Sequence, residues 1–87
     1  MKIKDQYMLR KVADAFVVVP IGAEVSNFNG MINLNGVGAF LWQQLEREIS
    51  FEELLKALTE EYEVDNETAE TDLKKFVAQL EESNLLL

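Results

Sequence analysis

Residues 32–42, with the sequence INLNGVGAFLW, contain the point at which the pattern of the chain changes from strand to helix. Before Asn35 the apolar residues form short β-branched runs, and after it they recur at offsets of three and four, as on one face of a helix. Asparagine caps helix N-termini because its side-chain oxygen accepts a backbone N–H of the first turn. The sequence therefore predicts one α+β domain, with its strands up to Leu34 and its helices after it.

The first two strands are predicted over residues 7–12 and 16–19, which are short runs rich in β-branched and apolar residues. Only three residues separate the two runs, a spacing typical of a hairpin. Pro20 ends the second strand, because proline has no N–H to donate to a ladder.

Two further strands are predicted over residues 25–28 and 31–34, on either side of Asn29-Gly30. This dipeptide tolerates the positive φ angles of a type I′ hairpin turn. The result is a small antiparallel sheet of three to four strands. The sequence leaves open whether residues 21–30 continue the second strand or cover the far edge of the last one.

Three helices are predicted over residues 36–47, 51–62 and 67–83, each with an apolar stripe on one face. Ser50 and Glu53 have the spacing of a capping box, in which each side chain bonds the other residue's backbone N–H. Asn84 is a plausible stop for the third helix. The apolar residues 85–87 are expected to pack back on the core or to pair beside a strand.

The net charge of the chain limits the kinds of partner that it can bind. Sixteen acidic residues against eight basic ones give a net charge of −8, which repels nucleic-acid phosphates and anionic lipid alike. No apolar run reaches the length of a membrane helix. We therefore expect no nucleic-acid partner and no membrane partner. The absence of cysteine fits a reducing, cytoplasmic location.

The inventory of reactive side chains disfavours catalysis. With no histidine and no cysteine, the commonest general base, thiolate nucleophile and transition-metal ligands are missing. Acidic neighbours such as Glu60 and Glu61 point about 100° apart on a helix rather than converging on a substrate. Residues 65–67 fit a helix cap better than a cation site, and Gly36-x-Gly38 lacks the third glycine of a dinucleotide motif. We expect no catalytic residue, no metal and no cofactor.

The order of these features resembles the PqqD-like family of peptide chaperones, also called RiPP recognition elements. The resemblance spans nearly the whole chain. The residues that carry it are Tyr7–Val12, Phe16–Pro20, the pair Leu34-Asn35, Gly38–Trp42, Ser50–Leu58, and Asp72 with Phe76 and Leu80. Its departure from compact members is the segment 21–30, which intervenes between the second strand and the last one.

The resemblance implies a winged-helix-like fold and a non-catalytic function. Members bind the leader segment of a ribosomally made precursor peptide as an added strand and present it to a modifying enzyme, commonly of the radical-SAM class. In such β-augmentation the sheet edge gives affinity and pockets for alternate side chains give selectivity. Carried onto this sequence, the peptide-binding residues are Met31, Ile32, Asn33 and Leu34 on the strand, and Asp72, Lys75, Phe76 and Gln79 on the third helix.

Two other functions compete with this one. A winged-helix regulator would need a basic third helix, whereas five acidic residues outnumber two lysines there. A structural dimer or adaptor would need a self-complementary apolar patch, for which Trp42 and the terminal leucines are the candidates. Trp42 is otherwise expected in the core, and the sequence leaves a homodimer open.

Overall fold

The structure, a computed structural model, describes residues 1–21 and 32–87. In it, strands β1 (Tyr7–Val12) and β2 (Ala15–Pro20) form a hairpin, and β3 (Ile32–Leu34) pairs with the other side of β2. Both pairings are antiparallel. The predicted strand 25–28 and its turn lie outside the described residues, as does Met31 at the start of the predicted strand 31–34.

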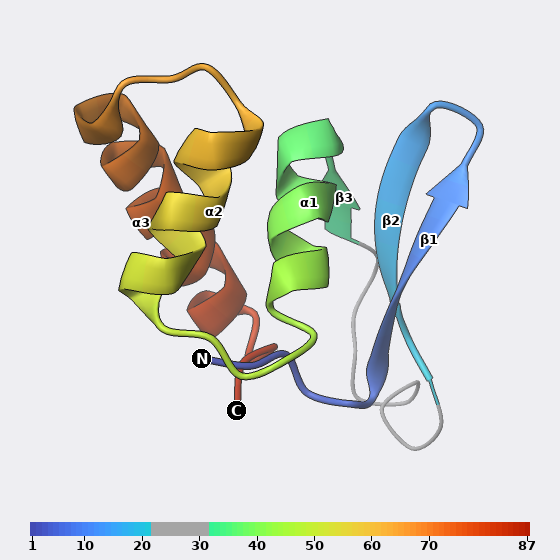
Figure 1. Ribbon diagram of the computed structural model, residues 1–87. Coiled ribbons are helices and arrows are strands. Elements are labelled where there is room, and N and C mark those ends of the chain that lie inside the picture. Colours follow the sequence, from blue (N-terminus) through green and yellow to red (C-terminus); the bar gives the residue numbers. More distant parts are fainter. Residues whose placement is uncertain (22–31) are drawn as a thin grey trace.

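Three helices follow the sheet: α1 (Gly36–Gln44), α2 (Phe51–Glu61) and α3 (Asn66–Glu82). Helices α2 and α3 pack together, α1 contacts both α2 and β3, and the β1–β2 hairpin lies at the opposite end of the molecule (Figure 1). The predicted α+β class, with a small antiparallel sheet followed by three helices, is confirmed. No helix in the described part of the chain is long and apolar enough to cross a membrane.

Helix α1 is shorter than its predicted range of 36–47, because residues far away in the sequence fix its end. Its last turn closes at Leu45, whose carbonyl accepts the backbone N–H of Ile3 at 2.8 Å. Four residues later, the N–H of Ile49 donates to the carbonyl of Met1 at 3.0 Å. The N-terminal segment thus bonds the residues that would have formed another helical turn. The other two helices end within one residue of prediction, and β2 includes Pro20 at its end.

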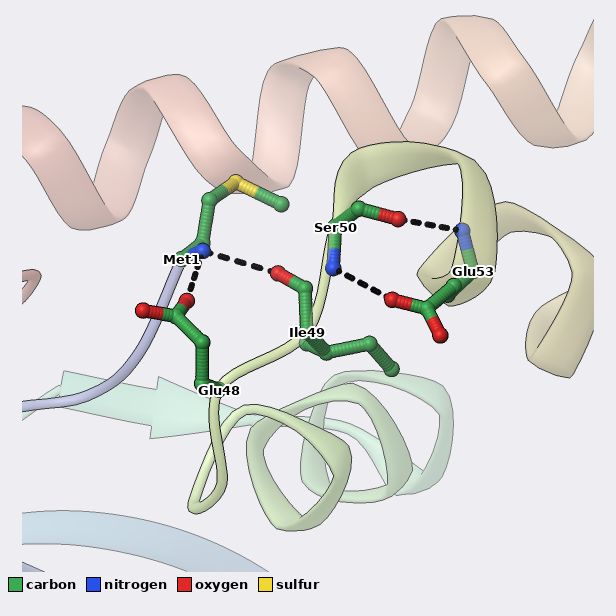
Figure 2. A network of polar contacts seen from close by, with 5 residues as sticks. All are labelled: Met1, Glu48, Ile49, Ser50 and Glu53. Atoms are coloured by element: carbon green, nitrogen blue, oxygen red, sulfur yellow. Dashed lines mark hydrogen bonds and ion pairs between the residues drawn. The ribbon is translucent and has the colours of Figure 1, made fainter.

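The predicted caps of α1 and α2 are present, whereas Asp65 at the N-cap position of α3 makes no side-chain capping bond. The side chain of Asn35 accepts the N–H of Gly38 at 2.8 Å, and Ser50 and Glu53 form the reciprocal capping box with both bonds at 3.1 Å. Figure 2 shows this box beside the N-terminal amine, which donates to the Glu48 carboxylate and to the Ile49 carbonyl. Hydrogen bonds to Ser50 lower the pKa of Glu53, and the bond from the amine lowers the pKa of Glu48.

The C-terminal residues pack back on the core, and one of them forms an isolated β-bridge outside the three strands. Asn84 has a φ of 59°, which ends α3 in the left-handed conformation that asparagine tolerates. Leu85 is fully buried, and Leu86 forms a β-bridge with Ile3, so the two chain ends lie side by side (Figure 1). The largest fully buried side chains share one core: Trp42, Leu45, Leu54, Leu73, Leu80, Leu85 and Val18.

The two glycines at the start of α1 allow a matched stability test. A Cβ at Gly36 would meet nothing within 4 Å, whereas one at Gly38 would lie 3.2 Å from the Leu34 Cβ and 3.3 Å from the Asn35 Oδ1. We expect Gly36→Ala to raise the free energy of unfolding by about 0.4–1 kcal/mol, through a less flexible unfolded chain. Gly38→Ala should gain less or lose stability, because its neighbours must move. Urea denaturation measures the free energy of unfolding of both variants. An equal increase in the two would show that the Leu34 side chain moves aside without cost.

Candidate binding site

The hydrogen-bonding direction of each strand follows from one bond at the base of the hairpin. The N–H of Ile21 donates to the carbonyl of Gln6 at 2.8 Å, so these two residues form a hydrogen-bonded pair. Such pairs alternate along an antiparallel ladder. The adjacent pair of Tyr7 and Pro20 is therefore a non-hydrogen-bonded one, which suits a proline. It follows that the odd-numbered residues of β2 bond β1, and that its even-numbered residues face β3.

This alternation assigns the free edge of the sheet to one residue of β3. Phe16 is paired with Leu34, and Val18 with Ile32, and both β2 residues are even-numbered. The backbone groups of Ile32 and Leu34 therefore bond β2. The N–H and C=O of Asn33 point the opposite way, to the edge that no strand covers among the described residues. Asn33 thus offers one donor and one acceptor to an incoming strand.

The two edges of the sheet differ in how well they are protected against pairing with another strand. Strand β1 carries Arg10 and Lys11, and the Lys11 ammonium lies 5.9 Å from the centre of the Phe16 ring. Charged side chains, lysine above all, are a common defence against unwanted strand pairing. Residues 32–34 of β3 carry no charge. The short β3 edge is therefore the one open to pairing with another chain.

A cavity of about 310 Å³ lies at the end of β3, where the chain enters α1. All three helices contribute to its walls, together with the connection between α2 and α3. Asn35, Gly38 and Asp72 supply its more polar side. Its apolar lining includes Val37, Leu41, Leu58, Tyr62, Val64 and Phe76. A single large side chain can therefore be buried in this cavity, which begins one residue after the end of β3.

The structure brings part of the predicted helix site to this cavity. Asp72 and Phe76 both line it, opposite the start of α1. Lys75 and Gln79 are exposed and lie on the same side of α3, since all four residues fall within about 100° of arc on a helix. The geometry therefore places Asp72 and Phe76 together, and leaves Lys75 and Gln79 beside them on the surface.

The predicted strand residues have different surroundings. Leu34 is 9% exposed and belongs to the core, while Ile32 is half-buried against it. The Asn33 side chain is exposed on the opposite face of the sheet. Met31 lies outside the described residues. A strand beside β3 would thus meet the backbone of Asn33 and the partly exposed side chain of Ile32.

Several cavity residues were not predicted as site residues. The sequence indicates a capping role for Asn35, and for Val37, Tyr62 and Val64 it indicates only positions in helices and loops. Tyr62 and Val64 are both half-buried, in an alternating pattern just after α2. The alternation of apolar Tyr62 and Val64 with acidic neighbours was the signal in the sequence, but only the packing of α2 on α3 brings them to the cavity.

The cavity and the β3 edge supply groups that can bind a peptide. In residues 1–21 and 32–87 no three acidic side chains gather closely enough to hold a metal ion. Glu48 and Glu53, each with a lowered pKa, bond terminal or backbone groups near the N-terminal end of α2, whereas the cavity lies near its C-terminal end. What the cavity and the edge provide is an apolar pocket and a main-chain donor and acceptor.

The competing functions find little support in this geometry. Helix α3 exposes Glu67, Asp72, Glu81 and Glu82, which would repel a phosphate backbone. Trp42 is fully buried, and so cannot supply the surface of a dimerisation adaptor. Of the terminal leucines only Leu87 is well exposed, at 78%.

Two solved structures resemble the whole fold. One is TbiB1 in complex with the TbiA(beta) leader peptide, with 31% identity, a TM-score of 0.78, and coverage of 99% of this chain and 94% of that one. The other is lasso peptide synthetase B1 complexed with the leader peptide, with 24% identity, a TM-score of 0.74, and coverage of 99% and 95%. A comparison with curated proteins finds no match. The family model described as coenzyme PQQ synthesis protein D (PqqD) matches residues 10–86, so the chain belongs to the PqqD family, as the sequence features indicated.

Proposed function

We propose that this protein binds the leader segment of a ribosomally made precursor peptide and presents it to a modifying enzyme, without catalysing a reaction itself. The leader adds as a strand along β3, where it bonds the backbone of Asn33 and packs against Asp72, Lys75, Phe76 and Gln79 of α3. Met31, Ile32 and Leu34 complete the strand surface of this proposed site.

The observation that carries this proposal is the uncharged β3 edge beside an apolar cavity. Strand addition requires unpaired main-chain groups and pockets for alternate side chains. Asn33 supplies the former through its outward N–H and C=O, and the cavity lined by Phe76 supplies the latter. The relative at 31% identity, similar over nearly the full length of both chains, was solved with a leader peptide bound.

The modifying enzyme is a separate part of the proposal. Family resemblance supports a radical-SAM enzyme, acting in the cytoplasm where the precursor is made. We expect such an enzyme, encoded beside the gene of this protein, to co-elute with it in size-exclusion chromatography when the leader is present. Co-elution with a modifying enzyme of another class would keep the peptide-binding function and correct the partner.

Leader binding is tested by titrating isotope-labelled protein with the leader of the precursor encoded beside its gene. We expect saturable amide shifts that cluster at Ile32–Leu34 and at Asp72–Gln79, because these segments border the open edge and the cavity. Amides of β1 serve as the internal control, since that edge carries Arg10 and Lys11.

Two results would contradict the proposal. Shifts confined to β1 or to the far side of α2 would mean that the peptide binds elsewhere. No shift at millimolar leader, together with no association with the neighbouring enzymes, would favour a structural adaptor instead.

A further inference from the structure

The stretch of chain that lines one side of the cavity at the end of β3 carries charge of one sign. Seven acidic residues and no lysine or arginine lie between Ala57 and Leu73, the stretch that forms the end of α2, the connection and the first half of α3. The cavity is lined from this stretch by Tyr62, Val64 and Asp72. An apolar pocket is thus bordered on this side by acidic residues, and the nearest lysines in sequence to the lining residue Asp72 are Lys74 and Lys75.

One of these carboxylates lines the cavity, and two more belong to residues that flank a lining residue in the sequence. Asp72 lines it directly, and Glu63 and Asp65 are the chain neighbours of the lining residue Val64. All three are exposed, and none forms an ion pair within the described part of the chain. Asp65 occupies the N-cap position of α3, yet its side chain makes no capping hydrogen bond. These carboxylates are therefore free to meet a charged group on a bound molecule.

We propose that this cavity takes one large apolar side chain of the bound peptide, and that Asp72, Glu63 and Asp65 select a peptide with a lysine or arginine next to that side chain. The inference rests on the proposed strand addition and specifies the class of peptide. A basic residue of the peptide is attracted to these carboxylates, which speeds association and fixes the register of the peptide along β3. An acidic residue at the same position of the peptide is repelled.

A displayed library of short random peptides, selected on the immobilised protein, tests this preference. We expect the recovered peptides to share a lysine or arginine beside an aromatic or large aliphatic residue. Val37→Trp should reduce their binding, because Val37 lines the cavity and is 37% exposed, so a larger side chain fills the pocket without disturbing the core. Val12→Trp, at an exposed position on β1, is the matched control.

Charge reversal then tests the role of Asp72. The best peptide is synthesised with lysine or glutamate at the selected basic position. On the wild type, glutamate should weaken binding by about fivefold to tenfold, and Asp72→Lys should reverse this preference. Glu82→Lys changes the net charge of α3 by the same amount at its far end, and should leave the preference unchanged. Rising salt concentration should weaken the binding of the lysine peptide more than the binding of the glutamate peptide.

The outcomes separate this inference from the function on which it rests. Peptides that still lose affinity with an Asn33→Pro variant, but show no preference for a basic residue, overturn the charge selection and leave strand addition standing. A preference that Glu82→Lys reverses as well as Asp72→Lys also overturns it. A library that yields no peptide sensitive to Asn33→Pro overturns both.

Discussion

An Asn33→Pro variant is expected to bind the leader peptide at least about tenfold more weakly than the wild type while keeping its fold. Proline removes the one N–H of β3 that points to the open edge, and its ring occupies the place of the incoming strand. The ladder with β2 uses Ile32 and Leu34 instead, so no existing strand bond is lost. Isothermal titration calorimetry measures the affinity, and thermal unfolding followed by circular dichroism measures the fold.

The matched control for this variant is Lys11→Pro on the other edge. Lys11 pairs with Phe16 at a non-hydrogen-bonded position, so its N–H also points away from β2. Both variants therefore remove one outward donor from an edge strand, where proline is tolerated. Equal affinity loss in the two variants would point to a general effect on the sheet, and unchanged affinity in Asn33→Pro would exclude strand addition at β3.

The elements that could be predicted from the sequence are those fixed by nearby residues. Asn35 caps α1 through Gly38, and Ser50 caps α2 through Glu53, so each helix start is encoded within four residues. Strand β1 and the first residues of β2 follow from short runs of apolar and β-branched residues joined by a short turn. In that turn Ala13 has a φ of 55°, a conformation that its residue type did not indicate.

What could not be predicted depends on residues far apart in the sequence. The end of α1 is set by bonds from Ile3 and to Met1, which no local pattern at Leu45 indicates. The cavity has the same origin: Tyr62 and Val64 reach it only because α2 packs on α3. The resemblance to a family named Asp72 and Phe76, which line one wall of this cavity, but the opposite wall arises from packing alone.

Replacement of Trp42 by alanine is expected to lower the free energy of unfolding by about 3–5 kcal/mol, the largest loss of stability among the changes considered. Trp42 has no exposed surface and lies in the centre of the core. Domains of this size are stable by about 5–15 kcal/mol in total, so a large share of Trp42→Ala molecules would unfold on mild heating. Urea denaturation followed by far-ultraviolet circular dichroism is the suitable measurement, because Trp42 is the single tryptophan and fluorescence is lost with it.

Trp42→Phe separates the packing of this ring from its polar atom. The indole Nε1 is buried and has no hydrogen-bond partner among the described residues, and an unpaired buried donor costs about 1–3 kcal/mol. Phenylalanine leaves a small void but removes that donor, so the two effects offset each other, and we expect a loss below about 1.5 kcal/mol. A loss as large as that of alanine would mean that Nε1 is bonded in the folded protein. Trp42 would then stabilise the core through its polar atom as well as through its size.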